Sequence, residues 1–438
     1  MNRSDTPRIV VVGGGAGGLE LVTRLGNRLG RKGKAQITLI DSQRTHIWKP
    51  LLHQIASGAS DSSEHALEYL AQAHWHGFRF RLGHMEGLDR ERKQVWLAPV
   101  LDTSGNEVIA NRSFSYDKLI IAVGSEGNDF GIEGVAEHCL MLDNKKQAEA
   151  FQVTMLNAML KAHTQKHALR TGQLDVAIVG AGATGVELAA QLHQVSRKVA
   201  AYGLDEIDPD RHMRINLIEA GPHILPALPE NLASDVTREL ERLQIRVITN
   251  AMVSRVTEEG MHIRDGEMIP AAIKVWTAGV KAPDFIKDLG LETNRINQIC
   301  VGPTLQSRSD DDIYAIGDCA EFIHEASGRA VPPRAQAAHQ QASHVARTLI
   351  RLVNGRNHDR KFTYRDYGAL VTLGRYSTVG SLMGSITGNV KITGYIARLV
   401  YLSLHKSHQL ALHGVFRTIL LTLAFLLRRT VDPPIKLH

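Results

Sequence analysis

The sequence contains few cysteines and no long uninterrupted apolar run. Its 438 residues include three cysteines, Cys139, Cys300 and Cys319, which lie far apart and form no Cys-x-x-Cys pair. This spacing gives no disulfide framework and no thiolate metal site, and it favours a reducing compartment. No segment reaches the roughly 20 apolar residues of a membrane-spanning helix. The first strand begins almost at once, so no signal peptide is expected.

The composition is that of an ordinary globular protein with two or three domains. Hydrophobic residues make up 43% of the chain and charged residues 22%, which argues against large-scale disorder. The chain contains 51 basic and 45 acidic residues. Seven of the basic residues and one of the acidic residues lie in 391–438, so the preceding residues contain 44 of each kind. The net charge of +6 therefore belongs to this C-terminal segment, with Lys391, Arg398, Lys406, Arg417, Arg428, Arg429 and Lys436 against Asp432.

A glycine-rich turn follows the first apolar run. Gly13, Gly15 and Gly18 satisfy the pattern G-x-G-x-x-G directly after the β-branched run at 9–12. Such glycines permit a tight turn, close approach of a pyrophosphate and close packing of a helix on a strand. A second strand, "QITLID", ends in Asp41, which is placed to bind a ribose hydroxyl group. The pattern predicts a dinucleotide site.

The same arrangement occurs a second time. Gly180, Gly182 and Gly185 follow the apolar run at 176–179, and "INLIEA" brings Glu219 to the end of a later strand. The two copies align without a gap. A second dinucleotide site is therefore predicted.

The acid of the second copy indicates which nicotinamide cofactor it binds. The Glu219 carboxylate would repel a 2′-phosphate, and no arginine follows it closely, which favours NADH over NADPH. Hydride transfer needs an acceptor ring against the nicotinamide, and a flavin is the usual acceptor. Two sites thus indicate a relay, with FAD in one copy and NADH in the other.

Further segments resemble a known flavoprotein family. "DDIYAIGDCA" is similar to the second flavin-binding motif of the two-dinucleotide-binding-domain flavoproteins, and "LIIAVGS" and "VWTAGV" are similar to the segments that cross between their domains. "HIWKPLLHQIASG" and "VPPRAQAAHQQA" resemble type II NADH:quinone oxidoreductase in its bacterial form. This family comprises single-subunit respiratory NADH dehydrogenases that pump no protons, and the resemblance covers essentially the whole chain.

The resemblance implies which residues bind the cofactors. Non-covalent FAD would contact Asp41, Lys49, Asp318 and Gln336, while Gln336 and Gln340 would face the quinone. Met85 stands where a β-branched residue commonly offers its backbone to the adenine. The full set expected for FAD is Gly13, Gly14, Gly15, Ala16, Gly17, Gly18, Asp41, Lys49, Met85, Gly124, Gly317, Asp318, Ala335 and Gln336. The set expected for NADH is Gly180, Ala181, Gly182, Ala183, Thr184, Gly185, Glu187, Glu219, Ala278 and Gly279.

Two features allow more than one interpretation. Glu187 lies two residues after the last glycine of its turn, and one interpretation is a carboxylate stabilised by the helix dipole. The resemblance implies another: a catalytic group, together with Gln336 and Gln340, that lies near the nicotinamide and the flavin and tunes their charge-transfer complex or relays protons towards quinone. Glu20 occupies the same offset in the first copy, which supports the structural interpretation. His405 and His408 lie three residues apart without a carboxylate or cysteine beside them, so interfacial polar residues are expected rather than a metal site.

The C-terminal segment combines apolar runs with basic residues. The ten residues from Thr418 to Leu427 carry no charge and are followed by Arg428 and Arg429. This run is too short to span a bilayer, and it is typical of helices that lie in a membrane interface, attracted by anionic headgroups. A helix hairpin buried in a homodimer interface is the alternative, and the two can coexist.

These observations define one expected architecture. The fold class is α/β, with two Rossmann-like dinucleotide-binding domains, the second inserted in the first, and C-terminal amphipathic helices that anchor the protein to a membrane. The FAD-binding domain is expected at 1–143 and 293–390, the NADH-binding domain at 144–292, and the anchoring helices at 391–438.

The expected activity follows from the resemblance. Two electrons would pass from NADH through FAD to a membrane quinone, ubiquinone or menaquinone, without proton pumping. The enzyme would lie peripherally on the cytoplasmic face of the inner membrane, and no nucleic-acid partner is expected. A disulfide reductase or a sulfide:quinone oxidoreductase would need suitably placed cysteines, which are lacking. A membrane-bound NADH/flavin redox sensor stays open as the alternative, because only sustained turnover distinguishes it from an enzyme.

Overall fold

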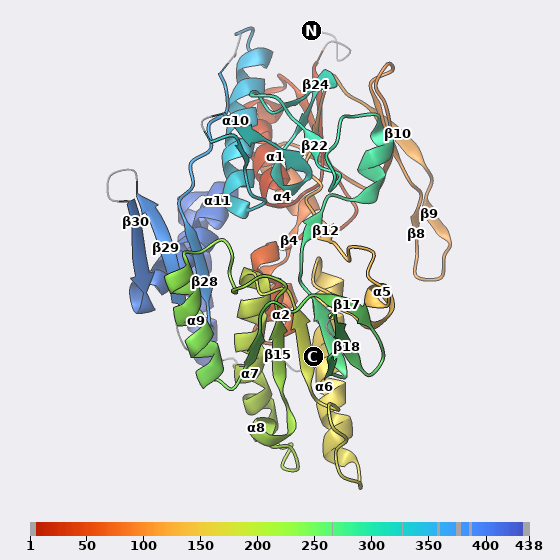
Figure 1. Ribbon diagram of the computed structural model, residues 1–438. Coiled ribbons are helices and arrows are strands. Elements are labelled where there is room, and N and C mark those ends of the chain that lie inside the picture. The colour runs from red at the N-terminus through yellow and green to blue at the C-terminus, as the bar shows by residue number, and fades with distance from the viewer. Residues whose placement is uncertain are drawn as a thin grey trace. The chain divides into compact units, whose positions relative to one another are not determined.

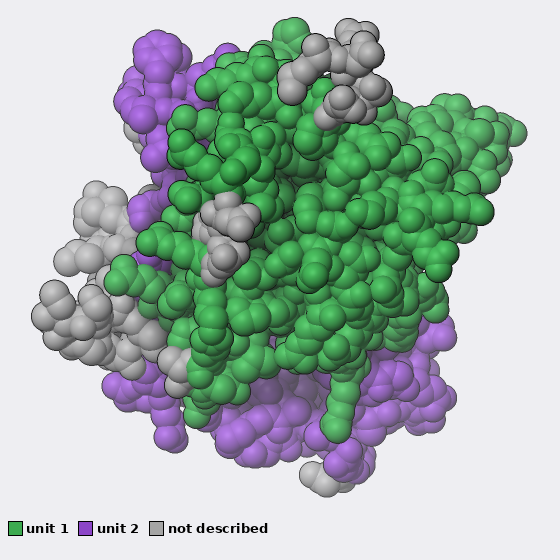
Figure 2. Space-filling view, turned by 90° about the horizontal axis from the view of Figure 1, so that it is seen from above, with its two compact units in different colours: residues 1–48, 66–126, 280–366 green, residues 49–65, 127–279, 367–438 purple. Residues whose placement is uncertain are grey.

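The computed structural model describes residues 6–264, 266–325, 327–356, 360–373, 378–384 and 388–431. The chain divides into two compact units, drawn in green and purple in Figure 2. Unit 1 comprises residues 1–48, 66–126 and 280–366, and unit 2 comprises residues 49–65, 127–279 and 367–438. The α/β class expected from the sequence is confirmed in both units, while the expected domain boundaries stay a prediction.

Unit 1 is built on a six-stranded sheet in the order β23-β24-β11-β1-β2-β5 (Figure 1). β1 (Arg8–Val12) lies parallel to both of its neighbours, and its residues from Ile9 onward are buried, as expected of a parallel strand that is covered on both faces. The strand order reverses at β1, so the turn after this strand lies at a topological switch point. The other strands of the sheet are β2 (Gln36–Asp41), β5 (Arg79–Leu82), β11 (Lys118–Ile121), β23 (Gln306–Ser307) and β24 (Asp310–Ala315).

Helix α1 (Ala16–Arg28) follows the turn after β1 and packs against α10 (Ala335–Val353). A Cβ atom added to Gly17 would lie 3.3 Å from the Ala338 carbonyl oxygen, so this glycine permits close helix packing. Unit 1 also contains η2 (Gly30–Lys32), β3 (Thr45–His46), β4 (Leu67–Glu68), α4 (Tyr69–His76), β6 (Met85–Asp89), β7 (Gln94–Leu97), β8 (Val100–Leu101), β9 (Glu107–Ile109), β10 (Arg112–Ser115), β21 (Val280–Lys281), η4 (Asp284–Leu289), β22 (Ile299–Cys300), η5 (Gly317–Cys319), β25 (Ala320–Glu321), β26 (Ile323–His324) and β27 (Arg329–Ala330). β12 (Glu126–Gly127) lies where the chain leaves this unit.

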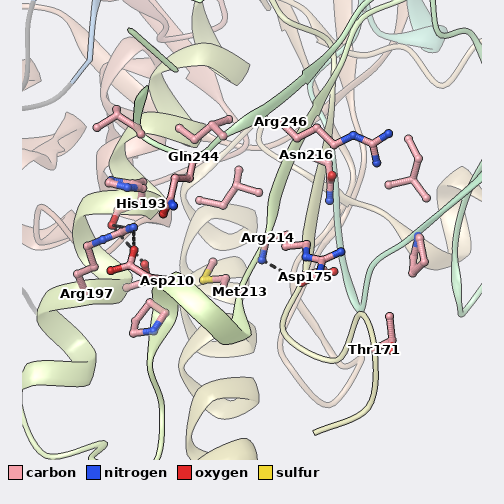
Figure 3. A pocket seen from close by; sticks show the side chains of 17 residues that line it. Thr171, Asp175, His193, Arg197, Asp210, Met213, Arg214, Asn216, Gln244 and Arg246 are labelled. Atoms are coloured by element: carbon pink, nitrogen blue, oxygen red, sulfur yellow. Dashed lines mark hydrogen bonds and ion pairs between the residues drawn. The ribbon is translucent and has the colours of Figure 1, made fainter. Parts of the chain in front are cut away.

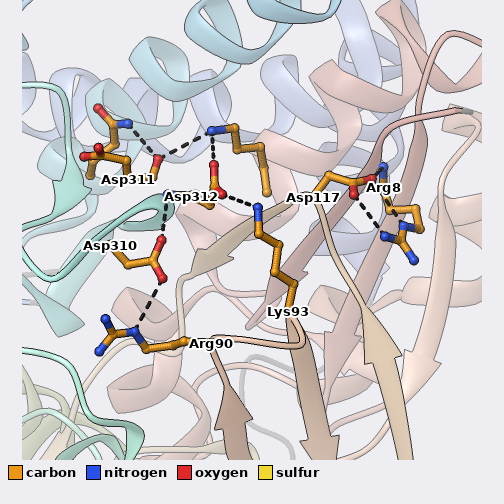
Figure 4. Close-up of polar contacts among 9 residues, drawn as sticks. Arg8, Arg90, Lys93, Asp117, Asp310, Asp311 and Asp312 are labelled. Atoms are coloured by element: carbon orange, nitrogen blue, oxygen red, sulfur yellow. Dashed lines mark hydrogen bonds and ion pairs between the residues drawn. The ribbon is translucent and has the colours of Figure 1, made fainter.

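Ion pairs join strands of this sheet near their amino ends to each other and to the turn between β6 and β7 (Figure 4). Arg8 Nη2 lies 2.9 Å from Asp117 Oδ1, and Asp312 pairs with both Lys93 and Lys118. Because these side chains are partly exposed, each pair contributes at most about 1 kcal/mol. These contacts lie at the edge of the sheet opposite the glycine turn.

Unit 2 repeats the arrangement with a five-stranded parallel sheet in the order β13-β20-β14-β15-β16. α7 (Ala183–Ala201) leads from β14 (Val176–Val179) to β15 (Ile215–Ile218), and the strand order again reverses at the strand before the glycine turn. The further elements are η3 (Lys49–Leu51), α2 (Leu52–Ala56), α3 (Ser62–His65), α5 (Val135–His138), β13 (Leu140–Met141), α6 (Lys145–Thr164), α8 (Pro209–His212), α9 (Glu230–Arg242), β16 (Arg246–Ile248), β17 (Val253–Val256), β18 (Gly260–Ile263), β19 (Met268–Pro270) and β20 (Ile273–Trp276).

The last part of unit 2 is an antiparallel sheet followed by a kinked helix. The sheet contains β28 (Ala369–Thr372), β29 (Thr378–Gly384) and β30 (Gly388–Thr393), and α11 extends over Gly394–Val431. Gly414 interrupts α11 with a left-handed φ of 73°. In the described part of the chain, no helix has both the length and the apolar character needed to cross a membrane. Residues 432–438 of the expected anchoring segment lie outside the described residues.

Candidate dinucleotide sites

The turn after β1 has the geometry of a pyrophosphate cradle. Gly13 has a φ of +100°, and a Cβ atom on Gly18 would lie 1.9 Å from the Gly13 carbonyl oxygen. A Cβ atom on Gly15, in contrast, would meet no described atom closer than 4.0 Å. Gly15 is also the N-cap of α1 and supplies no side-chain acceptor, so the first N–H groups of the helix remain available to a phosphate. The turn fits the pyrophosphate of FAD.

Asp41 lies at the end of β2, beside this turn, as the sequence predicts. Its Oδ2 atom accepts the Gly14 N–H at 2.6 Å and its Oδ1 atom accepts the Gln43 N–H at 2.7 Å. Burial raises the pKa of the Asp41 carboxyl, while these hydrogen bonds lower it. The contacts fix the carboxylate at the position where a ribose is expected.

Two side chains that the sequence did not single out hold the carbonyl group of Gly14. His46 Nδ1 lies 2.9 Å from this oxygen, and the Tyr69 hydroxyl donates to it at 2.8 Å. Burial lowers the pKa of His46 to about 4, so the imidazole is neutral and donates through Nδ1–H. A Cβ atom on Gly14 would lie 2.4 Å from the Tyr69 hydroxyl oxygen. These contacts could not be predicted from the sequence, because the residues lie far apart along the chain. His46 is nevertheless the first residue of one of the segments that carry the family resemblance.

The second flavin motif places further polar groups in unit 1, apart from the glycine turn after β1. Asp318 follows β24, and the Ser125 hydroxyl donates to its Oδ2 atom at 2.9 Å. Gly317 and Gly124 adopt φ values of +76° and +77°, which favour glycine. The Gly317 N–H donates to Gln341 Oε1 at 2.7 Å, a contact that sequence reasoning missed. The structure therefore brings the predicted Gly124, Gly317 and Asp318 to the carboxyl ends of β11 and β24.

The two glutamines expected at the quinone contact the segment at 365–366. Gln336 Nε2 donates to Asp366 Oδ1 at 3.1 Å. Gln340 exchanges two hydrogen bonds with the Arg365 backbone, at 2.8 and 3.0 Å. Both amides thus stabilise this segment, and their roles towards quinone stay a prediction.

The remaining residues expected to bind FAD lie at the starts of elements. Ala16 begins α1 and Ala335 begins α10. Met85 begins β6 and is 2% exposed. Lys49 begins η3 in unit 2, and its assignment to FAD stays a prediction.

The turn after β14 has the same geometry. Gly180 has a φ of +98°, and a Cβ atom on Gly185 would lie 2.0 Å from the Gly180 carbonyl oxygen. No described atom lies within 4 Å of the Cβ position of Gly182, the N-cap of α7. Ala183 and Thr184 form the first helical positions. This turn fits the pyrophosphate of NADH.

Glu219 repeats the contacts of Asp41. Its Oε2 atom accepts the Ala181 N–H at 2.9 Å, and its Oε1 atom accepts the Gly221 N–H at 2.9 Å. Ala181 stands in the second turn where Gly14 stands in the first. The equivalence of the two copies therefore extends to the hydrogen bonds of their acids.

The predicted Ala278 and Gly279 follow β20. Trp276 Nε1 donates to the carbonyl oxygens of Asn128 and Ala278, at 2.8 and 3.1 Å. Gly279 has a φ of +66°, and a Cβ atom there would lie 2.3 Å from the Phe130 ring. The positive φ favours glycine at this position, and the exposed Phe130 ring, which the sequence analysis did not select, would have to move to admit a side chain.

Glu187 is the fifth residue of α7, just after the first turn of this helix, and is 6% exposed. Its Oε1 atom accepts the Thr372 N–H at 2.9 Å. Burial raises the pKa of the Glu187 carboxyl to about 8, although this hydrogen bond lowers it. A carboxyl group with such a pKa holds a proton at neutral pH, which a surface carboxylate at a helix N-terminus would not do.

A pocket of about 280 Å³ in unit 2 lies at the other edge of the sheet (Figure 3). Asp175, Ile215 and Arg246, at the amino ends of β14, β15 and β16, contribute to its lining. The pocket contains the pair of Arg197 and Asp210. It is therefore distinct from the turn at the carboxyl end of β14.

Comparison with known proteins agrees with this geometry. Residues 7–342 match the family model described as pyridine nucleotide-disulphide oxidoreductase. A type II NADH:quinone oxidoreductase from Haemophilus influenzae is 42% identical, over 98% of this chain and 99% of that protein. The type II NADH:quinone oxidoreductase NdhA from Mycobacterium tuberculosis is 29% identical, over 91% of this chain and 82% of that protein. The structure of NDH2 from Plasmodium falciparum in complex with NADH has a TM-score of 0.81 at 19% identity and covers 98% of this chain and 100% of that chain.

The two Rossmann-like units and the family match define the class of protein as a pyridine nucleotide-disulphide oxidoreductase. Its described cysteines, Cys139, Cys300 and Cys319, are all free. Within this class, the chain belongs to the type II NADH:quinone oxidoreductase family.

Proposed function

We propose that this protein transfers two electrons from NADH through bound FAD to a membrane quinone, without proton pumping. The observation that carries this proposal is the presence of two equivalent cradles, each with an acid fixed by a backbone N–H of its own turn. FAD, when bound, supplies the chemistry: it accepts hydride from NADH and passes two electrons on. The residues of the chain bind and orient the two dinucleotides, and no nucleophile is required.

The experiment that tests this function separates an enzyme from a redox sensor. The purified protein should contain FAD that is released on heating, and NADH should bleach the flavin absorbance. Addition of a soluble quinone should then restore the absorbance and sustain NADH oxidation over many turnovers. One reduction event without sustained flux would contradict the proposal and favour the sensor. A protein without flavin absorbance would contradict both.

We further propose that α11 attaches the enzyme peripherally to the cytoplasmic face of the inner membrane. The support comes from apolar side chains beyond the kink at Gly414, which are exposed in the described chain: Val415, Phe416, Ile419, Leu420, Leu421, Leu423, Phe425 and Leu427. Contiguous exposed apolar surface is typical of membrane or protein interfaces. The basic residues of 391–438 would add about 1 kcal/mol each near an anionic surface.

Charged substitutions on α11 should release the enzyme from membranes. Removal of residues from Gly388 onward would also delete β30. The double substitution Phe416→Asp with Leu423→Asp instead keeps this strand and changes only α11. These side chains are 74% and 52% exposed, and loss of two large apolar contacts of about 2 kcal/mol each should lower vesicle binding at least 100-fold. Sedimentation with anionic vesicles measures the effect.

The matched control is Val153→Asp on α6, where the side chain is 52% exposed and vesicle binding should not change. NADH oxidation with a soluble quinone should persist in all variants. If the double variant became monomeric yet still sedimented with vesicles, α11 would be a homodimer interface instead.

A further inference from the structure

The internal duplication allows one peptide group to be compared in both dinucleotide sites. In the first turn this group joins Gly14 to Gly15, and in the second turn it joins Ala181 to Gly182. The N–H groups of Gly15 and Gly182 have no acceptor among the described residues, and each belongs to the N-cap of the helix that follows. Both N–H groups are therefore donors that a pyrophosphate can use.

In the first turn, two side chains fix the orientation of this peptide group. His46 Nδ1 lies 2.9 Å from the Gly14 carbonyl oxygen, and the Tyr69 hydroxyl donates to the same oxygen at 2.8 Å. Because a peptide group is planar and trans, its carbonyl and N–H bonds point in opposite directions. The two donors thus hold the Gly15 N–H towards the side of the turn that faces away from both rings. Hydrogen bonds to the carbonyl also polarise the N–H of the same group, which makes it a stronger donor to an anion.

Both side-chain donors are buried and are placed by backbone contacts. His46 is 3% exposed and Tyr69 is 2% exposed. β3 and β4 pair antiparallel, with His46 opposite Leu67, and the Tyr69 N–H donates to the Arg44 carbonyl at 3.1 Å. This short ladder brings the two side chains to the same turn. Burial and the neighbouring Asp41 carboxylate raise the pKa of Tyr69 well above its ordinary value, so the hydroxyl retains the proton that it donates.

The second turn holds the equivalent peptide group in a different way. The Ala181 carbonyl oxygen accepts the Leu225 N–H at 2.8 Å, and no side chain in the described part of the chain donates to it. Leu225 belongs to the loop between β15 and α9 and has a φ of +51°, a left-handed conformation that is costly for a residue with a Cβ atom. The second cradle therefore depends on a strained loop, whereas the first depends on two buried side chains.

We propose that His46 and Tyr69 are positioning residues that keep FAD bound between turnovers. The inference rests on the proposed function, in which FAD stays in the first site while NADH enters and leaves the second. The two side chains act through the peptide group of Gly14 and Gly15. They hold its N–H in the direction of the pyrophosphate before the cofactor binds, so less conformational freedom is lost on binding. The single backbone donor of the second turn suits a cofactor that must dissociate in each catalytic cycle.

Tyr69→Phe tests the proposal with the smallest change. The ring that packs against Phe80, with centroids 5.1 Å apart, is kept, and only the donor to the Gly14 oxygen is lost. Release of FAD from the holoenzyme, measured by flavin fluorescence after dilution, should become about 10-fold faster, which corresponds to one hydrogen bond of about 1.4 kcal/mol. The phosphorus NMR resonances of the bound pyrophosphate should also move, because the Gly15 N–H is no longer held in one direction. The affinity for NADH should not change.

His46 offers a second variant together with its rescue. His46→Leu removes the other donor and should also accelerate the release of FAD. His46→Asn carries an amide N–H close to the position of Nδ1 and should restore slow release. The matched control is Tyr116→Phe. Tyr116 is also fully buried in unit 1, but its hydroxyl has no hydrogen-bond partner among the described residues, so the release of FAD should keep its wild-type rate.

Release of FAD at the wild-type rate in Tyr69→Phe would overturn the proposal, whether or not His46→Leu folds. Faster release with unchanged phosphorus resonances and without rescue in His46→Asn would also overturn it, because such a result indicates a general loss of stability. Wild type that contains no FAD would overturn the proposed function. Wild type that retains FAD through both donors but reduces no quinone would overturn only the transfer of electrons to quinone and would support the role of His46 and Tyr69.

Discussion

Replacement of Gly182 by valine is expected to abolish NADH binding in a protein that still folds and still contains FAD. The backbone of Gly182 has an ordinary extended conformation, with φ −71° and ψ −174°, and no described atom lies within 4 Å of its Cβ position. The folded protein therefore accepts a side chain here without strain. The same side chain fills the space through which a pyrophosphate approaches the N-terminus of α7.

The affinity for NADH should fall by at least 100-fold, which corresponds to about 2.8 kcal/mol. Titration of the flavin absorbance with NADH measures this loss, and thermal unfolding and flavin content should match wild type. Gly185→Val is the opposite control, since its Cβ atom would lie 2.0 Å from the Gly180 carbonyl oxygen and should destabilise unit 2 itself. Gly15→Val should reverse the pattern and yield folded protein without FAD. Wild-type NADH affinity in Gly182→Val would contradict the assignment of this turn.

Glu219 is expected to set the preference for NADH over NADPH. Its carboxylate is fixed by two backbone N–H groups where the ribose of a bound dinucleotide is expected, so it repels a 2′-phosphate. In Glu219→Ala with Ala220→Arg, the repulsion is removed and a cation is added. The ratio of kcat/KM values should shift towards NADPH by at least 100-fold, because hydrogen bonds to charged groups contribute about 1.5–3 kcal/mol each.

Glu219→Gln separates the charge from the structural role of this residue. Its amide oxygen can still accept one of the two backbone N–H groups, so the turn should be retained while the repulsion is lost. NADPH oxidation should rise in this variant without a large loss of NADH oxidation. If wild type used both cofactors equally well, Glu219 would not be the selecting residue.

The sequence predicted the parts of the fold that local patterns encode. The segment "QITLID" coincides with β2 (Gln36–Asp41), and both predicted acids accept an N–H of their own glycine turn. Strand, turn and helix follow one another within a few residues here, so apolar runs and glycine spacing are sufficient. The membership of the family followed from segments spread along the chain.

The contacts that complete each site could not be read in this way. Tyr69 and Gly14 are 55 residues apart, and His53 and Glu187 are 134 residues apart. A buried histidine beside a buried carboxylate leaves no periodic trace in sequence, because each residue looks like a polar interruption of an apolar segment.

Nδ1 of the buried His53 lies 3.4 Å from Glu187 Oε2, and these two groups affect how the stability of unit 2 depends on pH. The folded state raises the pKa of Glu187 from 4.5 to about 8, so the stability contributed by its protonated form is fully present below pH 4.5 and is lost as the pH rises through 8. The folded state lowers the pKa of His53 from 6.5 to about 4, so its contribution is present above pH 6.5 and is lost as the pH falls through 4. Each slope corresponds to one proton, and the two are opposite in sign between pH 4.5 and 6.5. Over that interval the two slopes cancel, so the two buried groups together leave the free energy of unfolding independent of pH. In Glu187→Gln only the contribution of His53 remains, so the free energy of unfolding should decline as the solution becomes more acidic.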